Sequence, residues 1–200
     1  MIRQVVFDFG QVLVRYEPAY MTAVCVADPA DRKAVEAVVF DRLYWDRLDA
    51  GTIEDEEILA GIRSRLPARL WAEAEQTYCQ WYNHLPPVPG MAELAARLRA
   101  RGIKTYVLSN ISRGFAAHAD EFPVLAQADG CVFSGVCGFV KPQKEIYAYL
   151  CERFGLRPEE TVFVDDNARN VAGAQDYGIH GYLFDGDAAK LERYLEDLLQ

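Results

Sequence analysis

Short apolar runs, separated by segments with a helical pattern, constrain the fold of this chain more than any other feature. Five runs are rich in β-branched or aromatic residues and lack a strict alternation of apolar and polar positions. They lie at residues 5–7, 103–108, 131–133, 161–164 and 182–184. Runs of this kind are typical of strands buried on both faces of a parallel sheet.

Between these runs, apolar residues recur at the spacing of a helix. Three segments have this pattern, at residues 91–102, 142–155 and 191–198. In the first, Met91, Leu94, Ala95 and Leu98 fall on one helical face, and Gly102 is suited to end the helix. Strands that alternate with helices predict an α/β fold with a doubly wound parallel sheet.

Residues 17–87 differ from the rest of the chain, because they contain no convincing strand pattern. This stretch is rich in Ala, Glu, Arg, Leu and aromatic residues, and it leads into the proline-rich segment 86–90. Proline cannot continue a helix, so this segment marks a linker or a hinge. We therefore predict a helical domain at residues 17–87, inserted into an α/β core domain formed by residues 1–16 and 88–200.

Composition limits both the class of protein and the molecules that it can bind. The chain has 200 residues, is 51% hydrophobic and carries a formal net charge of −9. The apolar content excludes a disordered chain, a collagen and a coiled coil. The negative charge disfavours binding to nucleic acid or to an anionic membrane surface, although a small anion can still bind at a locally positive spot.

The sequence favours a cytoplasmic location. The five cysteines are odd in number and form no C-x-x-C motif, which is typical of reduced thiols. Asp8 interrupts the first apolar run too early for a signal peptide, and no stretch approaches the roughly 18 apolar residues of a membrane span. The sequence does not indicate an oligomeric state.

Polar residues that could together bind a metal ion and a phosphate follow four of the five predicted strands. They are Asp8, the pair Ser109-Asn110, Lys141, and the pair Asp165-Asp166. The carboxyl ends of parallel strands meet at one edge of the sheet, where ligands bind. Paired carboxylates suit Mg²⁺, a lysine can neutralise a phosphate, and an aspartate can attack phosphorus. The set predicts phosphoryl transfer with a small phosphorylated substrate and a Mg²⁺ cofactor.

Four motifs, VVFDFG, YVLSN, FVKPQKEIY and VFVDDNARN, resemble those of the haloacid dehalogenase (HAD) superfamily of hydrolases. The resemblance covers essentially the whole chain. It implies a HAD-like, Rossmannoid sheet with the strand order 5-4-1-2-3, and an α-helical cap domain at residues 17–87. Among its branches, the chain is most similar to the bacterial sugar-phosphate phosphatases that include α-D-glucose-1-phosphate phosphatase.

The resemblance also implies the metal site. Asp8 matches the catalytic nucleophile, which is a metal ligand as well. Gly10 would offer its backbone carbonyl to Mg²⁺, and Asp166 matches the acidic ligand of the last motif. Asp165 is either a direct ligand or a partner of the ligands.

The remaining motifs imply a phosphate site. Ser109 and the backbone of Asn110 match the phosphate-binding second motif, and Lys141 matches the lysine of the third. We expect Ser109 and Lys141 to take part in catalysis together with Asp8. Arg113 lies three residues after Asn110, and it either faces the phosphate or is a solvated helix residue.

Gly10 departs from the usual pattern of these phosphatases, which have a second aspartate two residues after the nucleophile. That aspartate protonates the departing oxygen. Three consequences are open: the leaving group is an easy one, such as an anomeric sugar oxygen; a water or a carboxylate such as Asp165 replaces the acid; or turnover is weak or lost.

These residues favour a Mg²⁺-dependent phosphatase that acts on a small phosphorylated metabolite, with a sugar phosphate expected, through an aspartyl-phosphate. One alternative is a 2-haloacid dehalogenase, which uses the same aspartate on carbon without a metal. Another is a non-catalytic HAD-fold protein that binds a phosphoanion or a partner. Four residues precede Gly51 and either read the substrate or pack within the helical bundle: Tyr44, Trp45, Arg47 and Asp49. We expect Tyr44 and Trp45 to be packed, and one or two of the four to reach the pocket.

Overall fold

The computed structural model describes residues 1–199 and contains a five-stranded parallel sheet. Its strands are β1 (Gln4–Phe7), β2 (Lys104–Ser109), β3 (Gly130–Phe133), β4 (Thr161–Asp165) and β5 (His180–Leu183). The spatial order is β3-β2-β1-β4-β5, which confirms the predicted order, counted from the opposite edge. All residues of the central β1 and of β4 are buried, whereas β5 lies at an edge and is partly exposed.

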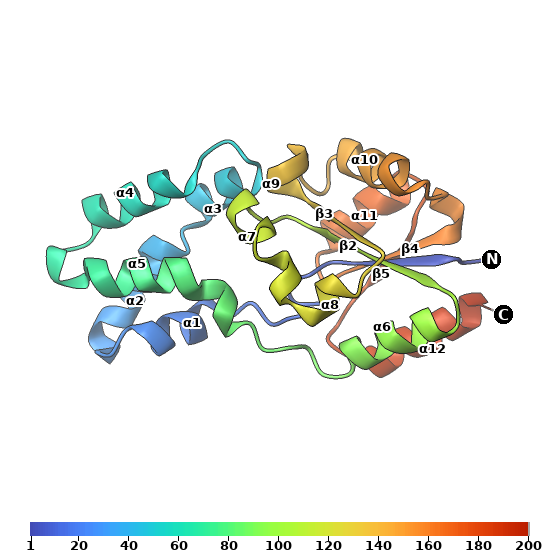
Figure 1. Ribbon diagram of the computed structural model, residues 1–200, viewed down its shortest axis with the longest axis horizontal. Coiled ribbons are helices and arrows are strands. Elements are labelled where there is room, and N and C mark those ends of the chain that lie inside the picture. Colours follow the sequence, from blue (N-terminus) through green and yellow to red (C-terminus); the bar gives the residue numbers. More distant parts are fainter. Residues whose placement is uncertain (200) are drawn as a thin grey trace.

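Helices cover both faces of this sheet (Figure 1). The long ones are α6 (Met91–Ala100), α10 (Lys144–Phe154), α11 (Ala168–Asp176) and α12 (Ala188–Leu199). Val5 and Phe7 of β1 pack in one apolar cluster with α6 and α12, and Val6 packs in a second cluster with α10 and α11. This alternation along β1 is the doubly wound arrangement that the apolar runs predict.

Short helices complete the part of the chain that follows α6. They are α7 (Arg113–Ala116), α8 (Pro123–Ala126), α9 (Ser134–Cys137), and the 3₁₀ turns Ala119–Glu121 and Pro158–Glu160. The predicted amphipathic helix at residues 91–102 is confirmed, because Met91, Leu94, Ala95 and Leu98 are all buried in α6. Gly102 follows with a φ of 79°, a left-handed conformation that suits the end of a helix.

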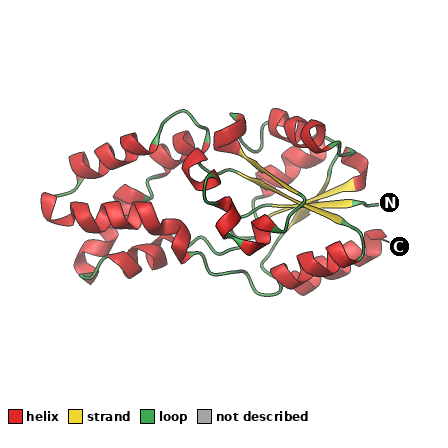
Figure 2. Cartoon of the chain, viewed as in Figure 1, coloured by secondary structure: helices red, strands yellow, loops and turns green. Residues whose placement is uncertain are grey.

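Helices and their connecting loops, without any strand, form the segment between residues 18 and 84, which we call the helical region (Figure 2). They are α1 (Pro18–Cys25), α2 (Pro29–Val39), α3 (Arg42–Asp49), α4 (Asp55–Arg65), α5 (Trp71–Gln80), and the 3₁₀ turns Ala68–Leu70 and Trp81–His84. Asp28 and Asp41 accept hydrogen bonds from the first turns of α2 and α3, as N-caps do. None of the helices between residues 1 and 199 is both long enough and apolar enough to cross a membrane.

The chain passes between the sheet and the helical region twice, through two segments that run side by side. Arg15 N–H donates to the carbonyl of Pro86 at 2.7 Å, and Val88 N–H donates to the carbonyl of Leu13 at 3.0 Å. The proline-rich linker of the sequence is one of these two segments. The crossing points are therefore tied to each other.

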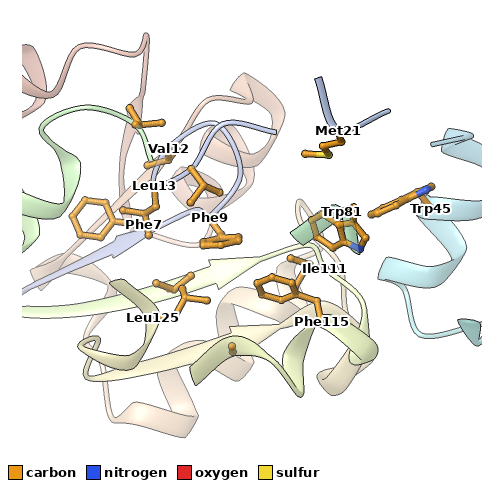
Figure 3. Close-up of a cluster of buried hydrophobic side chains, with 14 of the residues drawn as sticks. Phe7, Phe9, Val12, Leu13, Met21, Trp45, Trp81, Ile111, Phe115 and Leu125 are labelled. Carbon is orange, nitrogen blue, oxygen red and sulfur yellow. The ribbon is translucent and has the colours of Figure 1, made fainter. Parts of the chain in front are cut away.

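Aromatic side chains connect the two parts as well. Phe9 lies 5.2 Å from Phe115, Phe115 lies 5.5 Å from Trp81, and Trp81 lies 5.2 Å from Trp45, measured between ring centroids (Figure 3). Phe9 and Phe115 belong to the sheet side, whereas the two tryptophans belong to the helical region. This continuous apolar contact holds the helical region over the carboxyl ends of the strands.

Candidate active site

The register of the sheet brings the first and fourth sequence motifs together. Phe7 of β1 stands opposite Val164 of β4, and Asp8 N–H donates to the carbonyl of Val164 at 2.8 Å. The next residues along the two strands are therefore neighbours. These residues are Asp8 and Asp165.

A cavity of about 220 Å³ opens at these strand ends, between the sheet and the helical region. Its core side is lined by six residues that the sequence analysis selected: Asp8, Gly10, Ser109, Asn110, Lys141 and Asp166. Its opposite side includes Arg42, Trp45, Asp49 and Trp81. The carboxyl ends of the strands thus form one wall of the cavity, and the helical region forms the other. A ligand site at these strand ends is expected for an open α/β sheet.

Lys141 is the centre of the charged network on the core side. Its ammonium Nζ lies 2.9 Å from Asp8 Oδ1 and 2.7 Å from Asp165 Oδ2, and its side chain is 1% exposed. Burial alone would lower the pKa of Lys141, but Asp8 and Asp165 outweigh it and raise that pKa. The lysine is therefore charged inside the site.

Asn110 holds the backbone of Lys141 in place. Its side-chain oxygen accepts from Lys141 N–H at 2.8 Å, and its side-chain nitrogen donates to the Lys141 carbonyl at 3.0 Å. The Asn110 side chain thus links the end of β2 to the loop before α10. Both polar atoms of the Asn110 side chain are therefore engaged with the backbone of Lys141.

Asp165 is fully buried, and both of its oxygens already accept hydrogen bonds. Oδ1 accepts from Asn167 N–H at 2.8 Å, and Oδ2 accepts from Lys141 at 2.7 Å. Asn170 Nδ2 donates to both oxygens, at 3.2 and 3.0 Å. The sequence left two roles open for Asp165. This geometry favours the role of a partner that orients Lys141, and it disfavours the role of a direct metal ligand.

Negative charge is in excess at this edge. One oxygen from each of Asp8, Asp165 and Asp166 lies within 4.8 Å of the others, and Lys141 is the cation in contact with the first two. Burial, reinforced by Asp165, raises the pKa of Asp8 to about 7 despite Lys141. Partial desolvation and then Asp165 raise the pKa of Asp166 too. Hard carboxylate oxygens with surplus charge fit a divalent cation such as Mg²⁺.

Arg113 lies apart from this group. Its guanidinium is 3.5 Å from Glu54 of the helical region, and both side chains are largely exposed. It is not among the described residues that line the cavity. The structure thus brings together Asp8, Gly10, Ser109, Asn110, Lys141, Asp165 and Asp166, and it leaves Arg113 in an exposed ion pair.

The helical region supplies further lining residues. Of the four candidates before Gly51, Trp45 and Asp49 reach the cavity, whereas Arg47 contacts Glu57 and Tyr44 packs against Arg65. Arg42, at the start of α3, also lines the cavity and was not among the residues predicted from the sequence. Its position seven residues before Asp49 puts both on one face of α3, which is the signal that was available.

Known proteins resemble this chain in sequence and fold. A sesquiterpene phosphatase from Aspergillus oryzae is 28% identical over 197 residues, covering 94% of this chain and 92% of that protein. A (S)-2-haloacid dehalogenase from a Pseudomonas species is 30% identical over 100 residues, covering 50% of this chain and 44% of that enzyme. A solved HAD family enzyme from Bacteroides thetaiotaomicron, in complex with magnesium and inorganic phosphate, has a TM-score of 0.71 at 21% identity, covering 96% of this chain and 99% of that one.

The match to a known family covers strands β1 to β4, the site and the helical region together. Residues 2–178 match the family described as haloacid dehalogenase-like hydrolase. That span includes every charged residue of the site and runs from β1 to the end of α11. The chain belongs to the haloacid dehalogenase-like hydrolases.

Proposed function

We propose that this protein is a Mg²⁺-dependent phosphatase that hydrolyses a small phosphorylated metabolite, with a sugar phosphate as its substrate. One observation carries the proposal: the buried Asp8–Lys141–Asp165 network opens into a cavity also lined by Ser109. A nucleophilic carboxylate, a fixed positive charge and a hydroxyl group suit a phosphoryl group. The phosphatase relative and the neighbour with bound magnesium and phosphate support the same chemistry.

Asp8 is the proposed nucleophile. Its Oδ1 accepts from Lys141 and from Phe9 N–H, at 2.9 and 2.7 Å, which fixes the carboxylate and directs Oδ2 to phosphorus. Lys141 neutralises charge on the phosphoryl oxygens, while the Ser109 hydroxyl and the Asn110 backbone bind them. An aspartyl-phosphate on Asp8 forms first, and water then hydrolyses it.

The proposed metal ligands are the carboxylates of Asp8 and Asp166 and the backbone carbonyl of Gly10. Asp165, whose oxygens are already engaged, orients Lys141. A bound Mg²⁺ supplies charge neutralisation between the nucleophilic carboxylate and a phosphate dianion.

The helical region acts in this proposal as a cap domain, residues 17–87, over a core domain formed by residues 1–16 and 88–200. Arg42 and Asp49 offer polar groups to the bound molecule, and Trp45 and Trp81 offer an apolar wall. A compact molecule with hydroxyl groups and an apolar ring face, such as a sugar phosphate, matches this mixture in a cavity of about 220 Å³.

The experiment is a release assay for inorganic phosphate with Mg²⁺ and a panel of esters that includes glucose-1-phosphate and glucose-6-phosphate. We expect hydrolysis that EDTA suppresses and excess Mg²⁺ restores. Asp8→Asn should lower turnover at least about 10³-fold, because an amide is not a nucleophile. Asp28→Asn, an exposed N-cap of the helical region, is the matched control and should leave turnover unchanged.

A dehalogenase is the second candidate, favoured by the 30% identity to a (S)-2-haloacid dehalogenase. The Asp166 carboxylate at the site argues against it, because a metal-free reaction on carbon has no use for this added negative charge. Chloride release from 2-chloropropionate, with no phosphate release from any ester and no effect of EDTA, would reverse this conclusion.

A further inference from the structure

Position 10 lacks a proton donor where the leaving oxygen needs one. Gly10 has no side chain, and a Cβ built there would meet none of the described residues within 4 Å. Breaking a phosphate ester leaves negative charge on the departing oxygen, and a positioned acid is worth about 10²–10⁴-fold in rate. Some other group in the cavity must supply that proton if the substrate is an ordinary alcohol ester.

Asp49, the last residue of α3, offers a carboxyl group to the same cavity from the helical region. It is 8% exposed, and its Oδ1 has no hydrogen-bond partner among residues 1–199. A buried polar atom without a partner costs free energy of folding, so its presence calls for an explanation. Oδ1 of Asp49 is therefore not committed to a hydrogen bond within the described residues, in contrast to the two oxygens of Asp165.

Contacts with the core fix the position of Asp49. Its backbone carbonyl accepts from the Ser134 hydroxyl at 2.6 Å, at the end of β3. Two residues later, Gly51 has a φ of 67°, and a Cβ there would lie 2.8 Å from the Gly135 carbonyl oxygen. The carboxyl terminus of α3 is thus pressed against the core, which gives the Asp49 side chain a defined place over the strand ends.

Charged groups from three directions surround this carboxyl: Arg42 and Asp46 on its own helix, Asp8 after β1, and Lys141 before α10. Burial has the largest effect and raises the pKa of Asp49 to about 8. The group therefore carries its proton at neutral pH and can donate it. Asp165, the substitute considered from the sequence, uses both oxygens as acceptors within the core.

We infer that Asp49 is the general acid of the reaction, placed by the helical region where Gly10 leaves a gap; this rests on the proposed phosphatase function. Asp8 Oδ2 forms a bond to phosphorus while the bond from phosphorus to the ester oxygen breaks. The electron pair stays on that oxygen, which takes the proton of Asp49 and leaves as an alcohol. Asp49, now a carboxylate, then accepts a proton from the water that attacks the aspartyl-phosphate, releasing phosphate and free Asp8.

The first test compares two leaving groups in wild type and Asp49→Asn. Glucose-6-phosphate releases a poor leaving group, whereas p-nitrophenyl phosphate releases a good one that needs no proton. We expect kcat for glucose-6-phosphate to fall about 10²–10⁴-fold and kcat for the aryl ester to fall less than about tenfold. Asp28→Asn should change neither. Asp49→Ser is a second variant, with the same split between substrates expected.

The second test restores an acid from the other side of the cavity. A Cβ at position 10 has open space around it, and this position lines the cavity. The double variant Gly10→Asp with Asp49→Asn should therefore recover much of the lost glucose-6-phosphate activity. The basic limb of the kcat profile with pH should disappear in Asp49→Asn and return in the double variant. A residue that only shaped the pocket would not be replaced by a carboxyl at position 10, in the segment after β1.

The outcomes separate the two proposals. If wild type hydrolyses no phosphate ester in Mg²⁺, the phosphatase function is wrong, and the role of Asp49 falls with it. If wild type is active and Asp49→Asn lowers both substrates equally, or lowers neither, Asp49 is not the acid while the phosphatase function stands. Failure of Gly10→Asp to restore the alkyl ester in a folded double variant would also count against it.

Discussion

The charged side chains on the two sides of the cavity differ in burial and in hydrogen-bond partners. On the core side, Lys141 is buried between Asp8 and Asp165. On the side of the helical region, Arg42 is largely exposed and pairs with Asp46 of its own helix. Asp49 on that side has a carboxyl oxygen without a partner among the described residues.

This difference indicates separate roles for the two sides of the cavity in binding the substrate. Strand register fixes the core side, because parallel strands hold their end residues in a rigid relation. The helical region is joined to the core by two adjacent chain segments and an aromatic contact. Of its polar groups at the cavity, Arg42 is largely exposed, and Asp49 has an oxygen without a partner among the described residues. The rigid Asp8–Lys141–Asp165 network suits the phosphoryl group, which is the same in every phosphate ester. Arg42 and Asp49, on the other side of the cavity, suit the leaving group, which differs between esters.

The largest effect on stability should come from breaking the core network. Lys141→Met leaves Asp8 and Asp165 buried side by side without a cation, and we expect a loss of about 3–5 kcal/mol at neutral pH. Urea unfolding followed by circular dichroism measures it. Arg42→Met, across the cavity, should cause no measurable loss, because exposed ion pairs contribute little. Equal losses in the two variants would remove the contrast between the sides.

A smaller effect should come from the contact that positions Asp49. Gly51→Ala forces a Cβ into a left-handed backbone and against the Gly135 carbonyl, and we expect a loss of about 1–3 kcal/mol. Gly10→Ala is the matched change on the core side, where the φ is not left-handed and space is open. Thermal unfolding compares the two. If Gly51→Ala unfolds like wild type, α3 does not need this contact with the core.

A third effect should appear in the pH dependence of stability in Asp49→Asn. The folded-state pKa of Asp49 is raised to about 8, so the folded protein keeps a proton that the unfolded chain releases above about pH 4. Wild-type stability therefore falls relative to the variant between about pH 4 and about pH 8. The difference should grow by at most about 1.4 kcal/mol per pH unit and then level off.

Urea unfolding at pH 5, 6.5 and 8 measures this difference, with Asp28→Asn as the control. Asp28 is exposed and caps α2, and asparagine caps a helix as well, so this replacement should change stability little. A flat profile for Asp49→Asn as well would mean that the Asp49 carboxyl is solvated in the folded protein, contrary to its burial beside the cavity.

The sequence by itself determined the sheet, its helices and most of the charged edge. Strands at residues 103–108 and 161–164 are recognisable because their apolar residues are contiguous, and α6 because its apolar residues repeat at helical spacing. Asp8 and Lys141 could be predicted to meet because residues that follow parallel strands share one edge. These are local patterns combined with a general rule of sheet topology.

Only the tertiary structure decided how the remaining groups are used. Whether Asp165 bonds Lys141, whether Arg113 pairs with Glu54, and whether Asp49 faces the cavity depend on contacts between segments that lie far apart in the chain. Such contacts follow from how the helical region docks on the core, and periodicity within one segment carries no information about docking. Burial then sets the chemistry, because the same carboxyl is ionised in water and holds its proton in the wall of a cavity.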